Sequence, residues 1–156
     1  MRIAVGSDER THLTDVVLEE LRRRGFEVEL VGPLAGVKQS WSEVARIVAE
    51  KVARGEADEG ILFCWTGTGV SIAANKVPGI RAALCDDAET ARGARLWNNA
   101  NVLCMSLRRT SEAIAKEILE AWFSTRYIPN PEDDACLAQV EAIERDYRKA
   151  PEAIAS

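Results

Sequence analysis

The sequence is poor in the residues that build metal sites and disulfide frameworks. Its 156 residues include one histidine, His12, and four cysteines with no Cys-x-x-Cys pair. Zinc sites and disulfide-stapled domains both need closer clusters of these residues. We therefore expect no bound metal, no cofactor and no disulfide, in a protein that works in a reducing compartment.

Long apolar runs and blocks of like charge are also missing. No apolar stretch approaches the roughly 20 residues of a membrane span, and no basic-then-apolar leader stands out, so we expect neither a membrane protein nor a secreted one but a cytoplasmic protein. The net charge of −5 comes from 20 basic and 25 acidic residues. Because these charges are dispersed, the sequence argues against a nucleic-acid partner held through phosphates.

What the chain does contain is a regular alternation of strand-like and helix-like segments. The length suits one domain, predicted over residues 1–150 with a short tail at 151–156. The alternation predicts an α/β fold, a Rossmann-like three-layer α/β/α sandwich with a five-stranded parallel sheet. Strands are predicted within residues 2–8, 26–31, 61–64, 80–85 and 102–105.

Helices are predicted between and after these strands. Two starts stay open, because Ser40 or Ser42 can cap one helix and Asp86 or Asp87 another. Residues 32–36 are predicted to form a loop and 127–131 a linker. The last helix, with apolar side chains at Leu137, Val140 and Ile143, is expected to dock on a partner subunit. The predicted helices span residues 11–24, 40 or 42 to 54, the segment up to 76, 86 or 87 to 97, 110–123 and 132–149.

The stretch from Gly60 to Lys76 joins an apolar run to a glycine-containing turn and then to small helix-forming residues. This pattern predicts strand, loop and helix, since Gly67 and Gly69 permit positive φ angles and close approach to the main chain. Free amides at the start of such a helix can bind an anion or stabilise a developing oxyanion. The spacing matches neither the dinucleotide fingerprint nor a Walker loop, which disfavours a nucleotide site.

Cys64 ends the predicted strand beside these amides. The start of a helix stabilises a thiolate, so Cys64 can act as a base or nucleophile. The alternative is a small buried residue that only fills space, a common role for an isolated cysteine. Open α/β sheets bind ligands at the edge where their strands end, and this favours the functional interpretation.

Several segments together resemble a known family. They are Cys64-x-Thr66-Gly67-x-Gly69-x-Ser71 continuing to Lys76, then Gly79 to Ala82, Asn98-x-x-Asn101-Val102-Leu103, and Gly6-Ser7-Asp8. Over nearly its whole length the chain resembles the type B ribose-5-phosphate isomerases and galactose-6-phosphate isomerases. The resemblance implies a homodimer or dimer of dimers with sites at the subunit interface. It also implies metal-free aldose-ketose interconversion of a sugar or sugar phosphate through a cis-enediolate.

The resemblance assigns roles to individual residues. Cys64 matches the family's thiol base, and Thr66 matches a hydroxyl that assists ring opening or holds the sugar. Asp8 and Asn98 match positions that contact sugar hydroxyls, although a helix cap and a turn residue are the alternatives. The family's enediolate-stabilising amides fall on Gly67, Thr68, Gly69, Val70 and Ser71. Further substrate-binding candidates are Glu9, His12, Trp41, Trp65, Trp97 and Arg108.

The chain departs from the family at acid–base and phosphate-binding positions. Trp97 stands where the family has a ring-opening histidine, and Glu9 replaces a second histidine. Ala135 and Gln139 stand near the usual phosphate-gripping arginines. The tryptophans Trp41, Trp65 and Trp97 either pack in the core or offer aromatic faces to a sugar. Cations left to hold an anionic substrate are Arg10, Lys38, Arg108 and Arg109.

We therefore expect an aldose-ketose isomerase whose substrate preference has moved away from ribose 5-phosphate. One alternative is a conventional ribose-5-phosphate isomerase in which His12 has taken over proton transfer. Another is a catalytically silent sugar-binding subunit. The retained Cys64 and its amide loop argue against the silent subunit.

Overall fold

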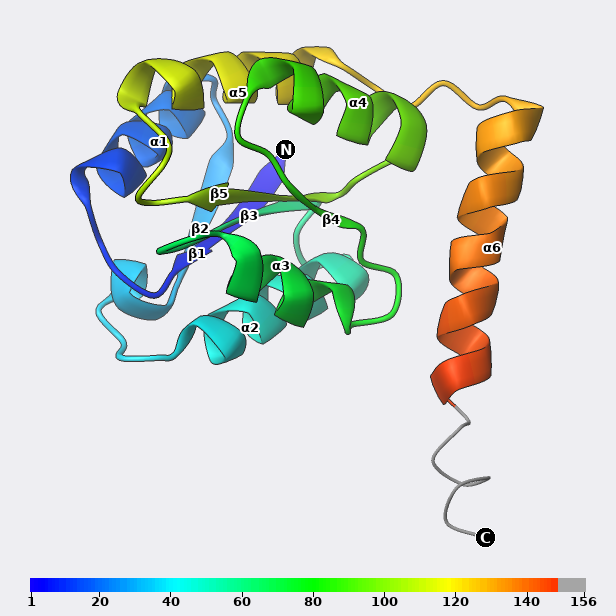
Figure 1. Ribbon diagram of the computed structural model, residues 1–156. Helices are drawn as coiled ribbons and strands as arrows, with labels where there is room; N and C mark the ends of the chain where they lie inside the picture. The colour runs from blue at the N-terminus through cyan, green and yellow to red at the C-terminus, as the bar shows by residue number, and fades with distance from the viewer. Residues whose placement is uncertain (149–156) are drawn as a thin grey trace, which may run out of the picture.

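Five parallel strands in the order β2-β1-β3-β5-β4 form the centre of the protein. The computed structural model describes residues 1–148. Figure 1 shows the sheet between two layers of helices, which confirms the predicted three-layer α/β/α sandwich. The strands are β1 (Arg2–Ser7), β2 (Glu27–Val31), β3 (Glu59–Cys64), β4 (Ala82–Leu84) and β5 (Val102–Ser106).

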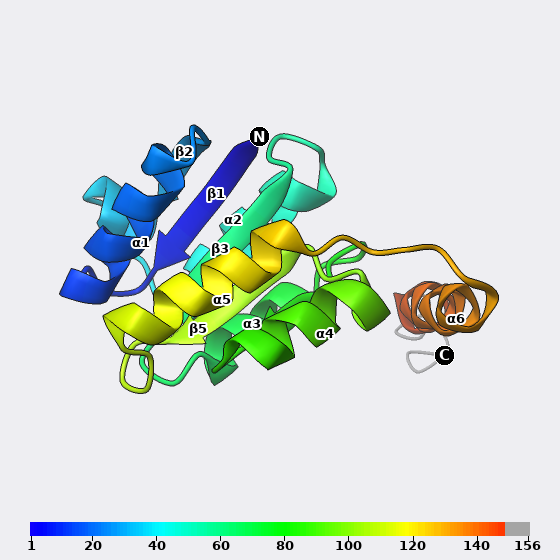
Figure 2. The same cartoon turned by 90° about the horizontal axis from the view of Figure 1, so that it is seen from above.

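The two faces of the sheet carry separate apolar cores. Helices α1, α4 and α5 cover one face, where they lie over the strands in Figure 2, and α2 and α3 cover the other. Both faces are covered because the crossover helices of a parallel sheet bury it on each side. The helices are α1 (His12–Arg23), the short 3-10 helix η1 (Gly32–Ala35), α2 (Trp41–Ala53), α3 (Thr68–Asn75), α4 (Ala88–Asn98), α5 (Glu112–Ser124) and α6 (Pro131–Arg148).

Side-chain caps start four of these helices. Thr11 and Ser111 cap α1 and α5. Of the open alternatives, Ser40 rather than Ser42 accepts the Glu43 amide at 3.3 Å, and Asp87 rather than Asp86 accepts the Thr90 amide at 2.7 Å. Each cap satisfies one of the free amides of a first helical turn, so the local sequence defines these starts.

Some predicted boundaries were wrong. Residues 32–35 form η1 rather than a loop, with Pro33 near the start of the turn. Strand β4 is shorter than predicted, because the Arg81 amide donates to the Asn101 side chain at 2.8 Å instead of continuing a strand ladder. Helix α6 begins at Pro131, one residue before the predicted start at residue 132. The predicted end of this helix at Lys149 and the tail at 151–156 lie outside the described residues.

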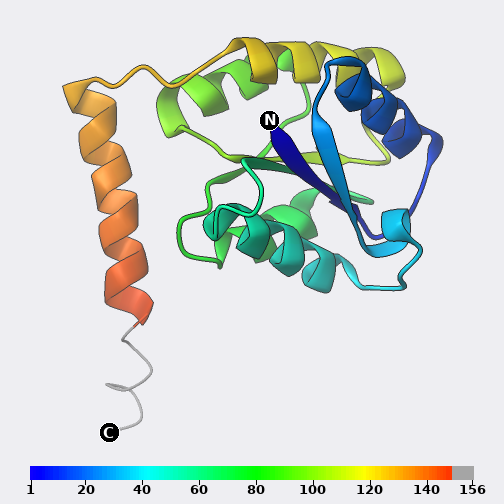
Figure 3. The same ribbon diagram turned by 180° about the vertical axis from the view of Figure 1, so that it is seen from behind.

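Helix α6 stands beside the sandwich rather than in it (Figures 1 and 3). None of its described residues is buried, and its Glu144 carboxylate accepts the Gly79 amide at 3.2 Å. The helix therefore leaves an apolar stripe that its own chain does not cover. Within residues 1–148, every helix is too short or too polar to cross a membrane.

A buried ion pair joins three elements at the edge where the strands begin. Arg95 of α4 donates to Glu59 of β3 at 2.7 Å, and its second terminal nitrogen donates to the Ala100 carbonyl at 2.8 Å. The Trp122 indole of α5 donates to the same Glu59 carboxylate at 2.9 Å. Both charged residues are buried, and the more exposed Arg126 adds a third donor to Glu59 at 3.3 Å. Arg95 is the buried charge that compensates the Glu59 carboxylate.

We predict that Arg95→Ala lowers the free energy of unfolding by about 3–5 kcal/mol, because it removes the buried cation beside Glu59 and leaves only the indole and the more exposed Arg126. Urea unfolding measures the change. Arg92→Ala is the matched control on the same helix, since Arg92 pairs with Glu89 at the surface and its loss should change stability by less than about 1 kcal/mol. Equal effects of the two substitutions would contradict this role for the buried pair.

Candidate active site

Cys64 lies at the edge of the sheet where the strands end. Strand β3 is buried along its whole length, and Cys64 is only 5% exposed. In the ladder, Phe63 pairs with Ser7 of β1 and Cys64 pairs with Ser106 of β5. The ends of three neighbouring strands therefore meet here, and the residues that follow each strand surround the thiol.

Gly67 turns the chain from β3 into α3. Its φ of 77° is left-handed, and a Cβ there would lie 2.5 Å from Leu84 Cδ1 and 3.0 Å from the Met105 carbonyl carbon. Two bonds tie this turn to the end of β5: the Ser106 hydroxyl donates to the Trp65 carbonyl at 2.9 Å, and the Leu107 amide donates to the Cys64 carbonyl at 3.0 Å. The loop beside the thiol is thus held rigidly against the neighbouring strand.

The first turn of α3 presents unsatisfied amides. No side chain caps this helix, so Thr68, Gly69 and Val70 have N–H groups without intrahelical partners. The Ser71 amide is already engaged, because it donates to the Gly67 carbonyl at 3.4 Å. The Thr66 and Thr68 hydroxyls lie 2.7 Å apart. Together with the helix dipole, these amides suit a negatively charged oxygen.

Trp41 lies against this loop. It is the first residue of α2, and a Cβ at Gly69 would come within 2.9 Å of its indole ring. Trp41 remains 44% exposed and Trp65 59% exposed. Neither is a core residue, so the structure leaves aromatic surface open next to the amides.

Asp8 and Glu9 follow β1 at the same edge. The Ser7 hydroxyl shapes their turn, because it donates to the Glu9 carbonyl at 2.6 Å and accepts the Glu9 amide at 3.2 Å. The pKa of Asp8 is raised above its usual value, chiefly because the carboxyl group is partly buried. A backbone hydrogen bond opposes this shift, and the neighbouring Glu9 charge adds to it. Asp8 is half-buried, whereas Glu9 is exposed.

The remaining candidates at this edge are exposed. His12 begins α1, and its Nε2 lies 3.3 Å from Glu112 of α5. The Arg108 amide donates to the Trp65 carbonyl at 3.1 Å, which places Arg108 beside the loop. Arg10 instead pairs with Asp15 at 2.9 Å, on the side of the sheet nearer β2. Lys38 and Arg109 are exposed on loops.

Trp97 and Asn98 do not join this cluster within one chain. They end α4, which runs back to the edge where β5 begins, and Val102 there pairs with Gly60 at the start of β3. Cys64 is about 13 Å further along that strand at 3.3 Å per residue. The indole of Trp97 covers Gly93 and is 62% exposed. The expected crowding of three tryptophans around the thiol is therefore not found in a single chain.

Sequence reasoning also missed one supporting residue, Ser106. Its hydroxyl holds the Trp65 carbonyl and accepts the Arg109 amide at 3.2 Å, so it orients both loops that flank Cys64. The prediction ended the fifth strand one residue earlier, at Met105. The only available signal was a small polar residue directly after an apolar run, and such residues are common at strand ends.

We predict that Gly67→Ala destabilises the fold by about 2 kcal/mol more than Gly36→Ala. Both glycines have a φ of 77°, but a Cβ at Gly36 would meet no atom within 4 Å. The comparison therefore cancels the left-handed strain and isolates the contacts with the Leu84 side chain and the Met105 backbone. Urea unfolding of both variants measures it, and equal losses of stability would show that the close approach is unimportant.

Solved structures share this fold. A ribose-5-phosphate isomerase B of Clostridium thermocellum superposes with a TM-score of 0.88 at 36% identity, covering 94% of this chain and 99% of the other. All five strands and their order thus belong to a sugar-phosphate isomerase fold.

Proteins related in sequence are sugar-phosphate isomerases as well. A D-erythrulose-4-phosphate isomerase 2 of Mycolicibacterium smegmatis is 42% identical, over 78% of this chain and 80% of the relative. A galactose-6-phosphate isomerase subunit LacB of Clostridium acetobutylicum is 38% identical, over 83% and 76%. The family model described as Ribose/Galactose Isomerase matches residues 3–139. The chain belongs to this family of isomerases, which confirms the resemblance and the prediction of an enzyme.

Proposed function

We propose that this protein is a metal-independent aldose-ketose isomerase that works through a cis-enediolate on a short, open-chain sugar or sugar phosphate. The observation that carries the proposal is the position of Cys64 directly before the uncapped amides of α3. A base and an oxyanion site are thereby held on one rigid turn. We further propose a cytoplasmic location, which agrees with four cysteines that are all free thiols.

The proposed chemistry moves two protons, one between neighbouring carbons and one between their oxygens. The Cys64 thiolate removes the proton from the carbon next to the substrate carbonyl, and the electron pair moves to the carbonyl oxygen. The amides of Thr68 to Val70 stabilise the resulting oxyanion, an effect typically worth about 3–4 kcal/mol per well-placed donor. The same thiol then returns the proton to the former carbonyl carbon, while the proton of the neighbouring hydroxyl passes to the oxyanion. The former carbonyl oxygen becomes a hydroxyl and the former hydroxyl oxygen becomes the new carbonyl, which converts an aldose into a ketose or the reverse.

Two losses support a substrate other than ribose 5-phosphate. Trp97 has no acidic or basic group to open a furanose ring, and Ala135 and Gln139 cannot grip a phosphate. A relative is named for D-erythrulose 4-phosphate. A four-carbon sugar esterified at its last oxygen cannot close a furanose ring, so an enzyme acting on it needs no ring-opening acid. Such a substrate fits the missing ring-opening group at Trp97, whereas Ala135 and Gln139 weaken the grip on the phosphate of either sugar.

We also propose a homodimer in which each site is shared between the two chains. Trp97 and Asn98 lie at the far edge of the sheet from Cys64, so only a second copy can bring them to the thiol. A cavity of about 430 Å³ separates α6 from the sandwich, with Trp97 on one side and Val140 and Ile143 on the other. Such exposed apolar surface is typical of an interface between subunits.

We predict that Cys64→Ala lowers kcat/KM at least about 100-fold, because it removes the proposed base. Solvent-deuterium incorporation next to the substrate carbonyl measures the proton step directly. Cys104→Ala is the matched control: it removes a thiol from the same apolar core but from inside the sheet, and activity should stay within about twofold. If Cys64→Ala exchanges the proton at the wild-type rate, Asp8 becomes the candidate base.

The shared site predicts complementation between two inactive variants. Cys64→Ala and Asn98→Ala are refolded together. Random pairing makes half of the dimers mixed, each with one intact site, so about a quarter of wild-type activity should return. Refolding Cys64→Ala with Cys64→Ser is the control and should restore nothing. A site contained in one chain would give no recovery in either mixture, and sedimentation would then show whether a dimer exists at all.

We predict that kcat/KM for erythrulose 4-phosphate exceeds that for ribose 5-phosphate at least about tenfold. The panel should include unphosphorylated erythrulose and ribose, which separate the effect of chain length from that of phosphate. Trp97→His should raise activity on ribose 5-phosphate more than on the four-carbon substrate, because it restores a ring-opening group. Ribose 5-phosphate as the best substrate would refute the shift, and activity on no sugar would favour a silent binding subunit.

A further inference from the structure

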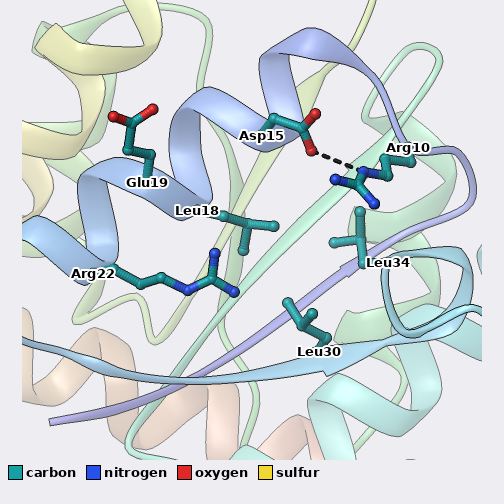
Figure 4. A pocket seen from close by; sticks show the side chains of 7 residues that line it. All are labelled: Arg10, Asp15, Leu18, Glu19, Arg22, Leu30 and Leu34. Carbon is teal, nitrogen blue, oxygen red and sulfur yellow. Dashed lines mark hydrogen bonds and ion pairs between the residues drawn. The ribbon is translucent and has the colours of Figure 1, made fainter.

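A second cavity lies on the face of the sheet that α1 covers, next to the edge strand β2. It encloses about 450 Å³ between α1, β2 and η1, and Cys64 is not among the residues around it. Figure 4 shows the apolar side chains inside it, Leu18, Leu30 and Leu34, each contributed by a different element. The cavity is therefore built by the tertiary fold and not by one segment of the chain.

Two guanidinium groups reach into this cavity. Arg10 comes from the loop after β1, and Arg22 comes from the far end of α1 (Figure 4). Arg10 uses its Nε to bond Asp15 at 2.9 Å, which leaves its two terminal nitrogens to face the leucines. Among the residues around the cavity, Arg22 has no ion-pair or hydrogen-bond partner, and Glu19 points away from it.

The four charged residues around the cavity have no net charge, but only one pair of them is in contact. Asp15 pairs with Arg10, whereas the Glu19 carboxylate points away from the cavity, so the Arg22 guanidinium stands unpaired above an apolar surface. A planar guanidinium matches a carboxylate with two parallel hydrogen bonds. Ligand pockets of a few hundred cubic ångströms commonly combine such an apolar lining with a few polar groups.

We propose that this cavity binds a small monocarboxylate with an apolar body. The body packs on Leu18, Leu30 and Leu34, and the carboxylate lies between Arg10 and Arg22. The single unpaired guanidinium, that of Arg22, favours a monoanion over a phosphate dianion. The site is separate from the proposed isomerase chemistry, because none of these residues has a part in it.

The position of Arg10 gives this site a route to the catalytic edge. Arg10 and Asp8 belong to the same short loop between β1 and α1, and Thr11 in that loop caps the helix. A carboxylate that draws the Arg10 guanidinium inward therefore acts on the segment that also carries Asp8. The binding itself can be measured without reference to any reaction.

Benzoate titrated into the full-length protein tests the proposal, with backbone amide NMR shifts as the readout. We expect saturable shifts in α1 and β2, including the Leu30 amide. Benzamide has the same shape without the charge and should bind at least about tenfold more weakly. Arg22→Gln should weaken benzoate binding at least about tenfold, whereas Arg46→Gln, an exposed arginine on α2, should change it less than twofold.

The outcomes separate this site from the isomerase site. Cys64→Ala should bind benzoate with the same affinity as the wild type. This result is expected whether or not Cys64 is the base of the proposed isomerase reaction. Arg22→Lys keeps the charge but loses the planar fork, so its affinity should fall between those of wild type and Arg22→Gln. Equal affinity for benzoate and benzamide, shifts confined to residues 67–71, or unchanged binding by Arg22→Gln would each overturn the proposal.

Discussion

The parallel ladder of β3 with β1 and β5 determines where the functional groups of this protein lie. β3 is hydrogen-bonded on both sides and buried along its length, so it cannot slip by one residue without turning its apolar side chains to the wrong face. This register places Cys64 level with Ser106 and one residue beyond the pair of Phe63 with Ser7. Asp8 and the loop after Cys64 therefore lie at the same edge of the sheet, the one where the strands end.

The loop after Cys64 combines close packing with unsatisfied hydrogen-bond donors. Gly67 must be a glycine because its backbone is left-handed and lies against Met105, and the lack of a side-chain cap leaves the amides of α3 free. The other long helices of the sandwich use Thr11, Ser40, Asp87 or Ser111 as caps. An uncapped helix start is a loss for stability and a gain for anion binding.

The opposite edge of the sheet is organised by a different interaction. The buried pair of Glu59 and Arg95 fixes the last turn of α4 against β3 and α5, and Trp97 and Asn98 project from that turn. A helix that crosses between parallel strands runs back along them, so its end lies far from the strand ends. One chain therefore holds the two halves of the proposed site at opposite edges, and the proposed dimer would unite them.

The sequence by itself determined the features that depend on neighbouring residues. Alternating apolar segments, capping side chains and the Cys64 to Lys76 pattern were enough to predict the sandwich, most helix starts and the amide loop, because each depends on local periodicity or turn chemistry. Only the tertiary structure decided which distant groups meet. Arg10 lies by β2 and not by the thiol, Trp97 lies at the far edge, and Glu59 finds Arg95, since strand order and helix direction are set by long-range packing that no local pattern encodes.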